Sequence, residues 1–96
     1  MSLDPSSAWY VYIIKASDSS LYTGISTDPQ RRFNEHQGGA KQAKYFRGRA
    51  PISIEYIEMC QCRRTASQRE YAIKKLTKTQ KLNLIKTYLL AHSVNV

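Results

Sequence analysis

Polar side chains that could act on a phosphate group recur in the first third of the chain. Tyr12 and Tyr22 belong to two short segments of β-branched and aromatic residues that we predict to pair as an antiparallel hairpin. If both rings face the same way, two phenols stand on one side of the hairpin and Gly24 leaves open space beside them. Arg32 and His36 are four residues apart, so they share one face of a predicted helix.

A carboxylate would complete a set suited to cutting phosphodiesters. Glu70 lies in a later predicted helix, and Glu58 is the only other acid in the last 39 residues. Such chemistry needs a carboxylate-bound metal, a cation on the developing charge and an acceptor for the proton of the attacking water. A phenol, with a pKa of roughly 10, is a poor acceptor unless nearby cations lower that pKa.

Each of these residues also has a purely structural interpretation. Tyrosines are common packing residues in strands, and Arg32 alone would be a solvated helix residue. A lone histidine such as His36 is usually a surface or core hydrogen-bonding residue. Glu70 would pair with Lys74 one helical turn later. Composition and spacing alone therefore do not select these residues as a site.

The elements that must position these side chains follow in the order ββ-α-β-αα. We predict strands over 9–15, 21–26 and 52–59, and helices within 27–39, 65–76 and 77–91. Asp28 or Thr27 caps the first helix, and the patterns Thr65-x-x-Gln68 and Thr77-x-x-Gln80 cap the other two. The last strand is predicted to alternate strictly, with Ile52, Ile54 and Tyr56 on one face, and the last helix to present Leu82, Ile85 and Leu89 on one face. The pattern indicates an α+β fold, a small three-stranded antiparallel sheet flanked by helices.

The length of 96 residues accommodates one domain. We expect it to span residues 9–90, between a disordered N-terminal tail at 1–8 and a C-terminal tail at 91–96. No apolar run approaches a membrane span, and the N-terminus lacks the pattern of a secretory signal. Cys60 and Cys62 are best interpreted as free thiols, which indicates a reducing cytoplasm.

The charge balance points to a polyanionic partner, with nucleic acid first and an acidic membrane surface second. Lysine and arginine number 15 against 7 acids, a net charge of +8. Four of the cations lie within nine residues of a connector, where Tyr45 could stack on a base or pin the connector to the core. The residues that we expect to contact nucleic acid are Arg31, Lys41, Lys44, Tyr45, Arg47 and Arg49.

Two tripeptides and three later residues carry a resemblance to a known family. "VYI" at 11–13 followed by "YTG" at 22–24 resembles the paired tripeptides of the GIY-YIG nuclease superfamily. Arg32, ten residues after Tyr22, then falls at the family's catalytic arginine, His36 at its His-or-Tyr position and Glu70 at its metal-binding glutamate. The similarity runs from about residue 9 to about residue 88 and is strongest to the small stand-alone YhbQ-like branch.

The resemblance implies a GIY-YIG endonuclease-like fold and a structure-selective DNA endonuclease acting in repair or recombination. The catalytic residues that it implies are Tyr12, Tyr22, Arg32, His36 and Glu70. Glu70 would bind a single Mg²⁺ or Mn²⁺, either tyrosine would accept the proton of water, and Gly24 would allow close approach.

Two departures from the family pattern keep other functions open. Tyr10 replaces the leading glycine of the first tripeptide, and Ile25 stands where the excision-repair relatives have a lysine. The alternatives are a nucleic-acid-binding module that kept the fold and lost catalysis, and a protein-interaction adaptor. With one domain and no separate DNA-recognition domain, we expect branched or single-stranded DNA to be selected by its shape, by a protein partner, or only weakly.

Overall fold

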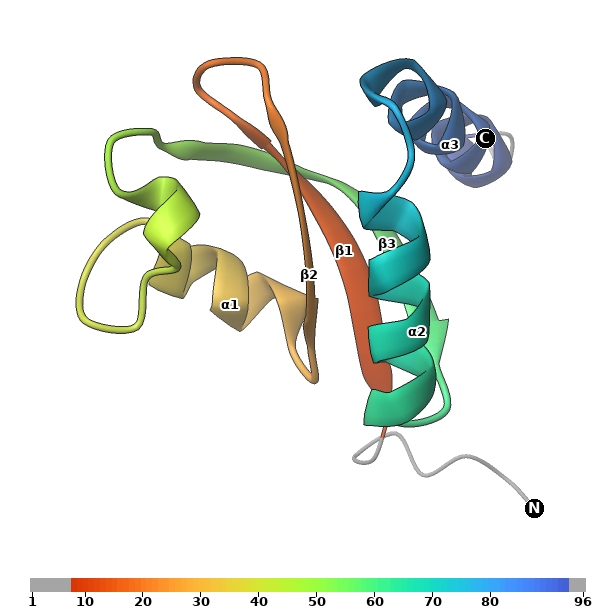
Figure 1. Ribbon diagram of the computed structural model, residues 1–96, viewed down its shortest axis with the longest axis horizontal. Coiled ribbons are helices and arrows are strands. Elements are labelled where there is room, and N and C mark those ends of the chain that lie inside the picture. The colour runs from red at the N-terminus through yellow and green to blue at the C-terminus, as the bar shows by residue number, and fades with distance from the viewer. Residues whose placement is uncertain (1–7, 94–96) are drawn as a thin grey trace.

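The computed structural model describes residues 8–93 as a three-stranded antiparallel sheet with helices on both faces (Figure 1). Its elements are β1 (Trp9–Ala16), β2 (Leu21–Ser26), α1 (Pro29–His36), the short 3₁₀ helix η2 (Lys44–Phe46), β3 (Pro51–Cys60), α2 (Arg63–Lys74) and α3 (Lys78–Ser93). The α+β class and the order ββ-α-β-αα are confirmed. Among the described residues, no helix has the length and hydropathy of a membrane span.

The ends of the ordered chain differ slightly from the expected tails. Residues 1–7 and 94–96 lie outside the described part of the chain. Ala8, expected in the N-terminal tail, is buried, and α3 continues through Ser93, within the range 91–96 expected as a C-terminal tail. The helix continues because Ala91 and His92 offer no helix-breaking residue before residue 93.

β1 is the central strand, because the sheet order is β2-β1-β3. A tight turn joins β1 to β2, with Ser19 in the left-handed region at φ 68° and the Asp18 carboxylate accepting from the Ser20 backbone N–H at 3.0 Å. In the resulting register Tyr12 lies opposite Gly24. The hairpin predicted from the sequence therefore forms, and it sets the glycine directly beside the tyrosine.

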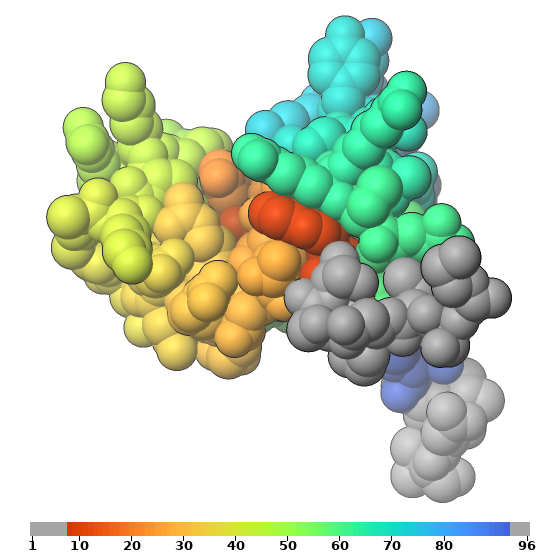
Figure 2. All heavy atoms as spheres, turned by 90° about the horizontal axis from the view of Figure 1, so that it is seen from below, coloured from red at the N-terminus to blue at the C-terminus, as the bar shows by residue number. Residues whose placement is uncertain are grey.

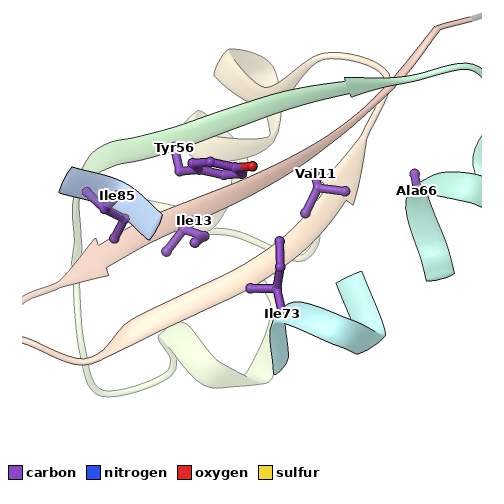
Figure 3. Packing of buried hydrophobic residues seen from close by; sticks show 6 residues of the cluster. All are labelled: Val11, Ile13, Tyr56, Ala66, Ile73 and Ile85. Carbon is purple, nitrogen blue, oxygen red and sulfur yellow. The ribbon is translucent and has the colours of Figure 1, made fainter. Parts of the chain in front are cut away.

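The two faces of the sheet carry separate apolar clusters. One cluster packs under α2 and α3 and consists of Val11, Ile13, Tyr56, Ala66, Ile73 and Ile85 (Figure 3). The other packs under α1 and η2 and consists of Tyr12, Ile14, Ala16, Phe33 and Phe46, with Tyr22 and Tyr45 packed against it. Alternation along β1 thus sends its aliphatic residues to one face and Tyr12 to the other.

A bulge in β3 overturns the strict alternation predicted for that strand. Ile13 pairs with Tyr56 whereas Ile14 pairs with Ile54, so Glu55 is an extra residue in the ladder. Ile54 therefore packs on the α1 side and Tyr56 on the α2 side, instead of sharing a face.

The helix caps largely follow the sequence. The Asp28 carboxylate accepts the Arg31 backbone N–H at 3.1 Å at the start of α1, and Pro29 fills the first position. At the start of α3, Thr77 and Gln80 form the predicted reciprocal pair, at 2.9 and 3.2 Å. α2 begins two residues before the predicted Thr65.

That earlier start has a local cause in the side chain of Thr65. Cys62 occupies the cap position of α2, and its backbone N–H donates to the Thr65 hydroxyl at 3.3 Å. Thr65 is therefore the third helical residue, and Gln68 has no part in the cap.

α3 buries a different face from the predicted one. Ile85 is 6% exposed, but Leu82 and Leu89 are 47% and 49% exposed, and Leu84 and Tyr88 pack against the core instead. Apolar residues lie on several sides of this helix, so their periodicity does not select a face, and contact with the sheet does.

We expect Ile85→Ala to lower the free energy of unfolding by about 2–4 kcal/mol, because it opens a cavity under α3. Leu89→Ala, the matched change on the exposed side, should cost less than about 1 kcal/mol. Urea unfolding followed by circular dichroism measures both. Equal losses in the two variants would contradict the observed orientation of α3.

Candidate active site

A hollow lies between two parts of the surface that carry the elements of the predicted site. Figure 2 shows residues 29–50, in yellow to light green, on one side and residues of α2, in green, on the other. Strand residues in red and orange lie between them at its floor. Side chains from α1, the connector and α2 can therefore reach one space over β1 and β2.

Tyr12 is held between strand β2 and α1. Its side chain is 1% exposed, and its ring centroid lies 6.3 Å from that of Tyr22. A Cβ at residue 24 would lie 2.5 Å from the Tyr12 hydroxyl oxygen and 2.7 Å from Cζ, so only glycine fits there. The predicted same-face placement of Tyr12, Tyr22 and Gly24 is observed.

His36 is fully buried and makes two hydrogen bonds that define its tautomer. Nε2 lies 3.1 Å from the Tyr12 hydroxyl, and Nδ1 accepts the backbone N–H of Ala43 at 3.3 Å. Because Nδ1 accepts, the proton of the neutral ring must be on Nε2. We infer that Nε2–H donates to the Tyr12 oxygen, which leaves the Tyr12 hydroxyl proton available to another partner.

Burial dominates the acid–base behaviour of this pair. Burial lowers the pKa of His36 to about 4, helped by the Arg32 charge and opposed by Glu35, so the ring is neutral at pH 7. Burial also raises the pKa of Tyr12, and Tyr22 and Glu70 raise it further, whereas Arg32 lowers it. Tyr12 is therefore a neutral phenol at pH 7.

Charged side chains from both sides of the hollow affect the pKa of the Tyr12 hydroxyl. Arg32 comes from α1 and Glu70 from α2, and both act on the Tyr12 hydroxyl. Arg32 is 28% exposed at its side chain and donates from Nη1 to Glu35 at 3.0 Å and to the Lys41 carbonyl at 2.6 Å. These contacts orient the guanidinium group and link it to the connector.

Tyr22 lies in an aromatic group that continues into the connector. Its ring centroid lies 5.3 Å from His36, 5.1 Å from Tyr45 and 5.0 Å from Phe46. The Tyr45 hydroxyl donates to Ser20, and the Arg49 guanidinium lies 4.2 Å from the Tyr45 ring centroid. Of the two roles open to Tyr45, these contacts favour pinning the connector to the core.

The cations predicted to contact nucleic acid differ in their surroundings. Arg49 pairs with Asp18 at 3.2 Å and is therefore partly neutralised. The remaining predicted side chains are exposed and belong to α1 or the connector, on one side of the hollow: Arg31, Lys41, Lys44 and Arg47.

Glu70 lies on α2 with its side chain 22% exposed. The Lys74 ammonium pairs with its Oε2 at 3.2 Å. The structural interpretation of Glu70 as a helix ion pair thus holds in the absence of metal, and Lys74 occupies the position of a compensating cation.

α2 is anchored to β3 by a second ion pair on its other side. Arg69 donates to Glu58 at 3.0 Å, and the Tyr56 hydroxyl donates to the same carboxylate. Because Glu58 engages Arg69, this neighbouring guanidinium does not neutralise Glu70. The anchor therefore ties α2 to β3.

Among residues 8–93, no group of three or more His, Cys, Asp or Glu side chains could hold a metal ion. Glu70 is the one carboxylate that acts on Tyr12. A single carboxylate suits a divalent ion that keeps most of its water and takes its remaining ligands from a phosphate. The donor set therefore fits a hydrated Mg²⁺ or Mn²⁺ and not a closed protein cage.

Comparison with known proteins decides the family. The family defined by the GIY-YIG catalytic domain matches residues 8–83. The chain belongs to the GIY-YIG family. This span takes in every residue of the candidate site, from Tyr12 in β1 to Glu70 in α2.

The relatives of this GIY-YIG domain are YhbQ-like UPF0213 proteins. A UPF0213 protein of Desulfotalea psychrophila is 51% identical over 82% of this chain and 72% of its own length. The UPF0213 protein YhbQ of Escherichia coli is 43% identical over 80% of this chain and 76% of its own. The solution structure of a UPF0213 protein from Bacillus halodurans matches with a TM-score of 0.54 and 38% identity, over 83% of this chain and 84% of that one. The predicted YhbQ-like branch and fold are thereby confirmed.

Several residues that support the site were not identified from the sequence. Glu35 stands three residues after Arg32, and that spacing alone could have indicated the pair. Ala43 contributes only a backbone N–H, and Ser20 contributes only a contact to Tyr45. No residue pattern in the sequence therefore predicts a role for either residue.

We expect the stability of the protein to fall as the pH drops from 7 to 5. The imidazole of His36 takes a proton near pH 6.5 in the unfolded chain but only near pH 4 in the folded one. The unfolded state therefore binds more protons between these values, and the loss by pH 5 should be about 2 kcal/mol. Urea unfolding at a series of pH values measures it.

His36→Gln should flatten this pH dependence, whereas His92→Gln, at the exposed end of α3, should retain it. An unchanged slope in His36→Gln would show that another group causes the loss.

Proposed function

We propose that the protein is a metal-dependent DNA endonuclease that hydrolyses phosphodiester bonds. One observation carries the proposal: Arg32 from α1 and Glu70 from α2 both act on the buried hydroxyl of Tyr12. A cation for the developing charge and a carboxylate for a metal, one on α1 and one on α2, thus both influence the same polar group. The match to the GIY-YIG catalytic domain supports the same reaction.

Glu70 would hold the metal, which supplies charge to a phosphate oxygen and to the attacking water. Lys74 must give up its ion pair with Glu70 for this to occur. The pair joins residues one turn apart on a helix and the Lys74 side chain is 53% exposed, so separating it costs about 0.3–0.5 kcal/mol. Glu70 is therefore available to a metal at little cost.

The two tyrosines have different roles in this proposal. The raised pKa of Tyr12 keeps its proton in place, and His36 already donates to its oxygen. Tyr12 then donates its own proton, to a water or a phosphate oxygen, and orients it. Tyr22 is more exposed and lies beside Tyr12, so it is the tyrosine that takes the proton from the attacking water, after releasing its own hydroxyl proton to solvent.

Arg32 would stabilise the charge that develops on the phosphate in the transition state, since its planar guanidinium suits two phosphate oxygens. His36 is a positioning residue, because it acts through Tyr12. Gly24 keeps the space that the Tyr12 ring and an approaching strand require.

The substrate we propose is branched or single-stranded DNA, and the setting is repair or recombination in the cytoplasm. The exposed connector cations lie on one side of the hollow and would follow a phosphate backbone. Specificity in this proposal comes from DNA shape or from a protein partner.

The proposal is tested by incubating the protein with hairpin, flap, junction and single-stranded DNA in the presence of Mn²⁺. We expect nicking that falls at least about 100-fold in Glu70→Ala and in Arg32→Ala, because each removes a group acting on the reacting phosphate. Tyr22→Phe should lose more activity than Tyr12→Phe. Lys86→Ala, an exposed change of the same charge on α3, should retain activity.

Full activity in Glu70→Ala and Arg32→Ala would reject the proposed site. Salt-dependent DNA binding without cutting on any substrate would favour the binding module, for which the unfilled lysine position at Ile25 is the supporting observation.

A second prediction concerns Lys74 and the metal. Lys74→Gln removes a competing cation 3.2 Å from the Glu70 carboxylate, so Mn²⁺ should bind the free protein about 2- to 5-fold more tightly. Lys75→Gln is the matched control, because it changes the net charge equally but lies over the Tyr71 ring. Electron paramagnetic resonance of free Mn²⁺ measures both, and equal effects would assign the change to overall charge.

A further inference from the structure

Tyr71 is the one tyrosine within residues 8–93 whose side chain is largely exposed, at 64%. Tyr12 and Tyr56 are buried, and the others are partly covered by neighbouring elements. An exposed aromatic ring gains little from its position in the fold, so packing does not account for Tyr71.

Its position on α2 places Tyr71 beside the candidate metal ligand. Tyr71 follows Glu70 directly, and at 3.6 residues per turn it lies about 100° around the helix from Glu70. The Lys75 ammonium lies 4.2 Å from the ring centroid. The ring is thus steadied by a cation while most of its surface remains open to solvent.

The surroundings of Tyr71 are strongly basic. From residue 63 to residue 75 the chain carries five cations and a single acid, Glu70. The cations are Arg63, Arg64, Arg69, Lys74 and Lys75. Arg69 is paired with Glu58 and Lys74 with Glu70, whereas Lys75 lies against the Tyr71 ring. Figure 2 shows α2, in green, across the hollow from the connector, so a bound strand would meet basic segments of the chain on both sides.

We propose that Tyr71 and Lys75 form a binding site for one unpaired nucleotide of the nucleic-acid strand, with the base stacked on the Tyr71 ring and its phosphate bound by Lys75. The inference rests on the proposed function and specifies its substrate as locally single-stranded DNA. An exposed aromatic ring flanked by cations is the arrangement that binds single strands without sequence preference. A paired duplex offers no free base face to such a ring.

Tyr45, the other aromatic residue near the site, does not meet this requirement. Its ring packs against Tyr22 and Phe46, and its hydroxyl is bound to Ser20. A base could reach Tyr45 only by displacing these contacts.

The test measures binding in EDTA, so that cutting plays no part. A fluorescein-labelled 12-nucleotide single strand and the matching duplex are titrated with the protein by fluorescence anisotropy. Tyr71→Ala should weaken single-strand binding about 5- to 20-fold and duplex binding less than about 2-fold. Tyr71→Phe should retain single-strand binding, and Leu89→Ala, a truncation of an exposed apolar residue on α3, should change neither.

A single strand carrying 2-aminopurine reports stacking directly. Its fluorescence should be quenched by the wild type and by Tyr71→Phe, and the quenching should be lost in Tyr71→Ala. Unchanged binding in Tyr71→Ala, equal losses for single strand and duplex, or no binding of single strands by the wild type would each overturn the inference. Stacking without any cutting in Mn²⁺ would instead reject only the nuclease activity, and cutting without stacking would reject only the Tyr71 site.

Discussion

Tyr12 can lie across the neighbouring strand only because residue 24 has no side chain. The distances of 2.5 and 2.7 Å from a Cβ at this position to Tyr12 leave no room for any other residue. This contact lets the phenol run under α1 to His36 rather than out to solvent. The position of α1, the environment of Tyr12 and the approach of Tyr22 all depend on it. The open space expected beside Gly24 is therefore filled by the Tyr12 ring, and the glycine serves the site through packing.

A chain of hydrogen bonds links the basic connector to the centre of the sheet. The Ala43 N–H is bound to Nδ1 of His36, and Nε2–H is bound to Tyr12. The Arg32 guanidinium is bound to the carbonyl of Lys41, two residues earlier in the connector. Movement of the connector on binding a polyanion would therefore reach both the arginine and the phenol. The connector thus has a structural role besides the charge that its side chains carry.

The opposite wall of the hollow, formed by α2, carries two ion pairs with different roles. Glu58 pairs with Arg69 and so links β3 to α2, whereas Glu70 pairs with Lys74, which lies on the same helix and is 53% exposed at its side chain. Ion pairs with exposed side chains contribute little to stability and exchange readily. The first pair therefore joins two elements of the fold, and the second joins none. The same helix bears Tyr71, whose exposed ring contributes little to the stability of the fold.

The sequence alone predicted the α+β class, the order of elements and the α1 and α3 caps. It also predicted the grouping of Tyr12, Tyr22 and Gly24. These predictions were possible because strand alternation and helix capping are local properties of the chain. The family resemblance added Arg32, His36 and Glu70, which spacing alone did not select. Only the tertiary structure decided the bulge at Glu55, the buried face of α3 and the start of α2. It also decided the His36 tautomer, which requires the backbone of Ala43 seven residues away. These features depend on which surfaces meet when the chain closes, and residue types along the chain do not carry that information.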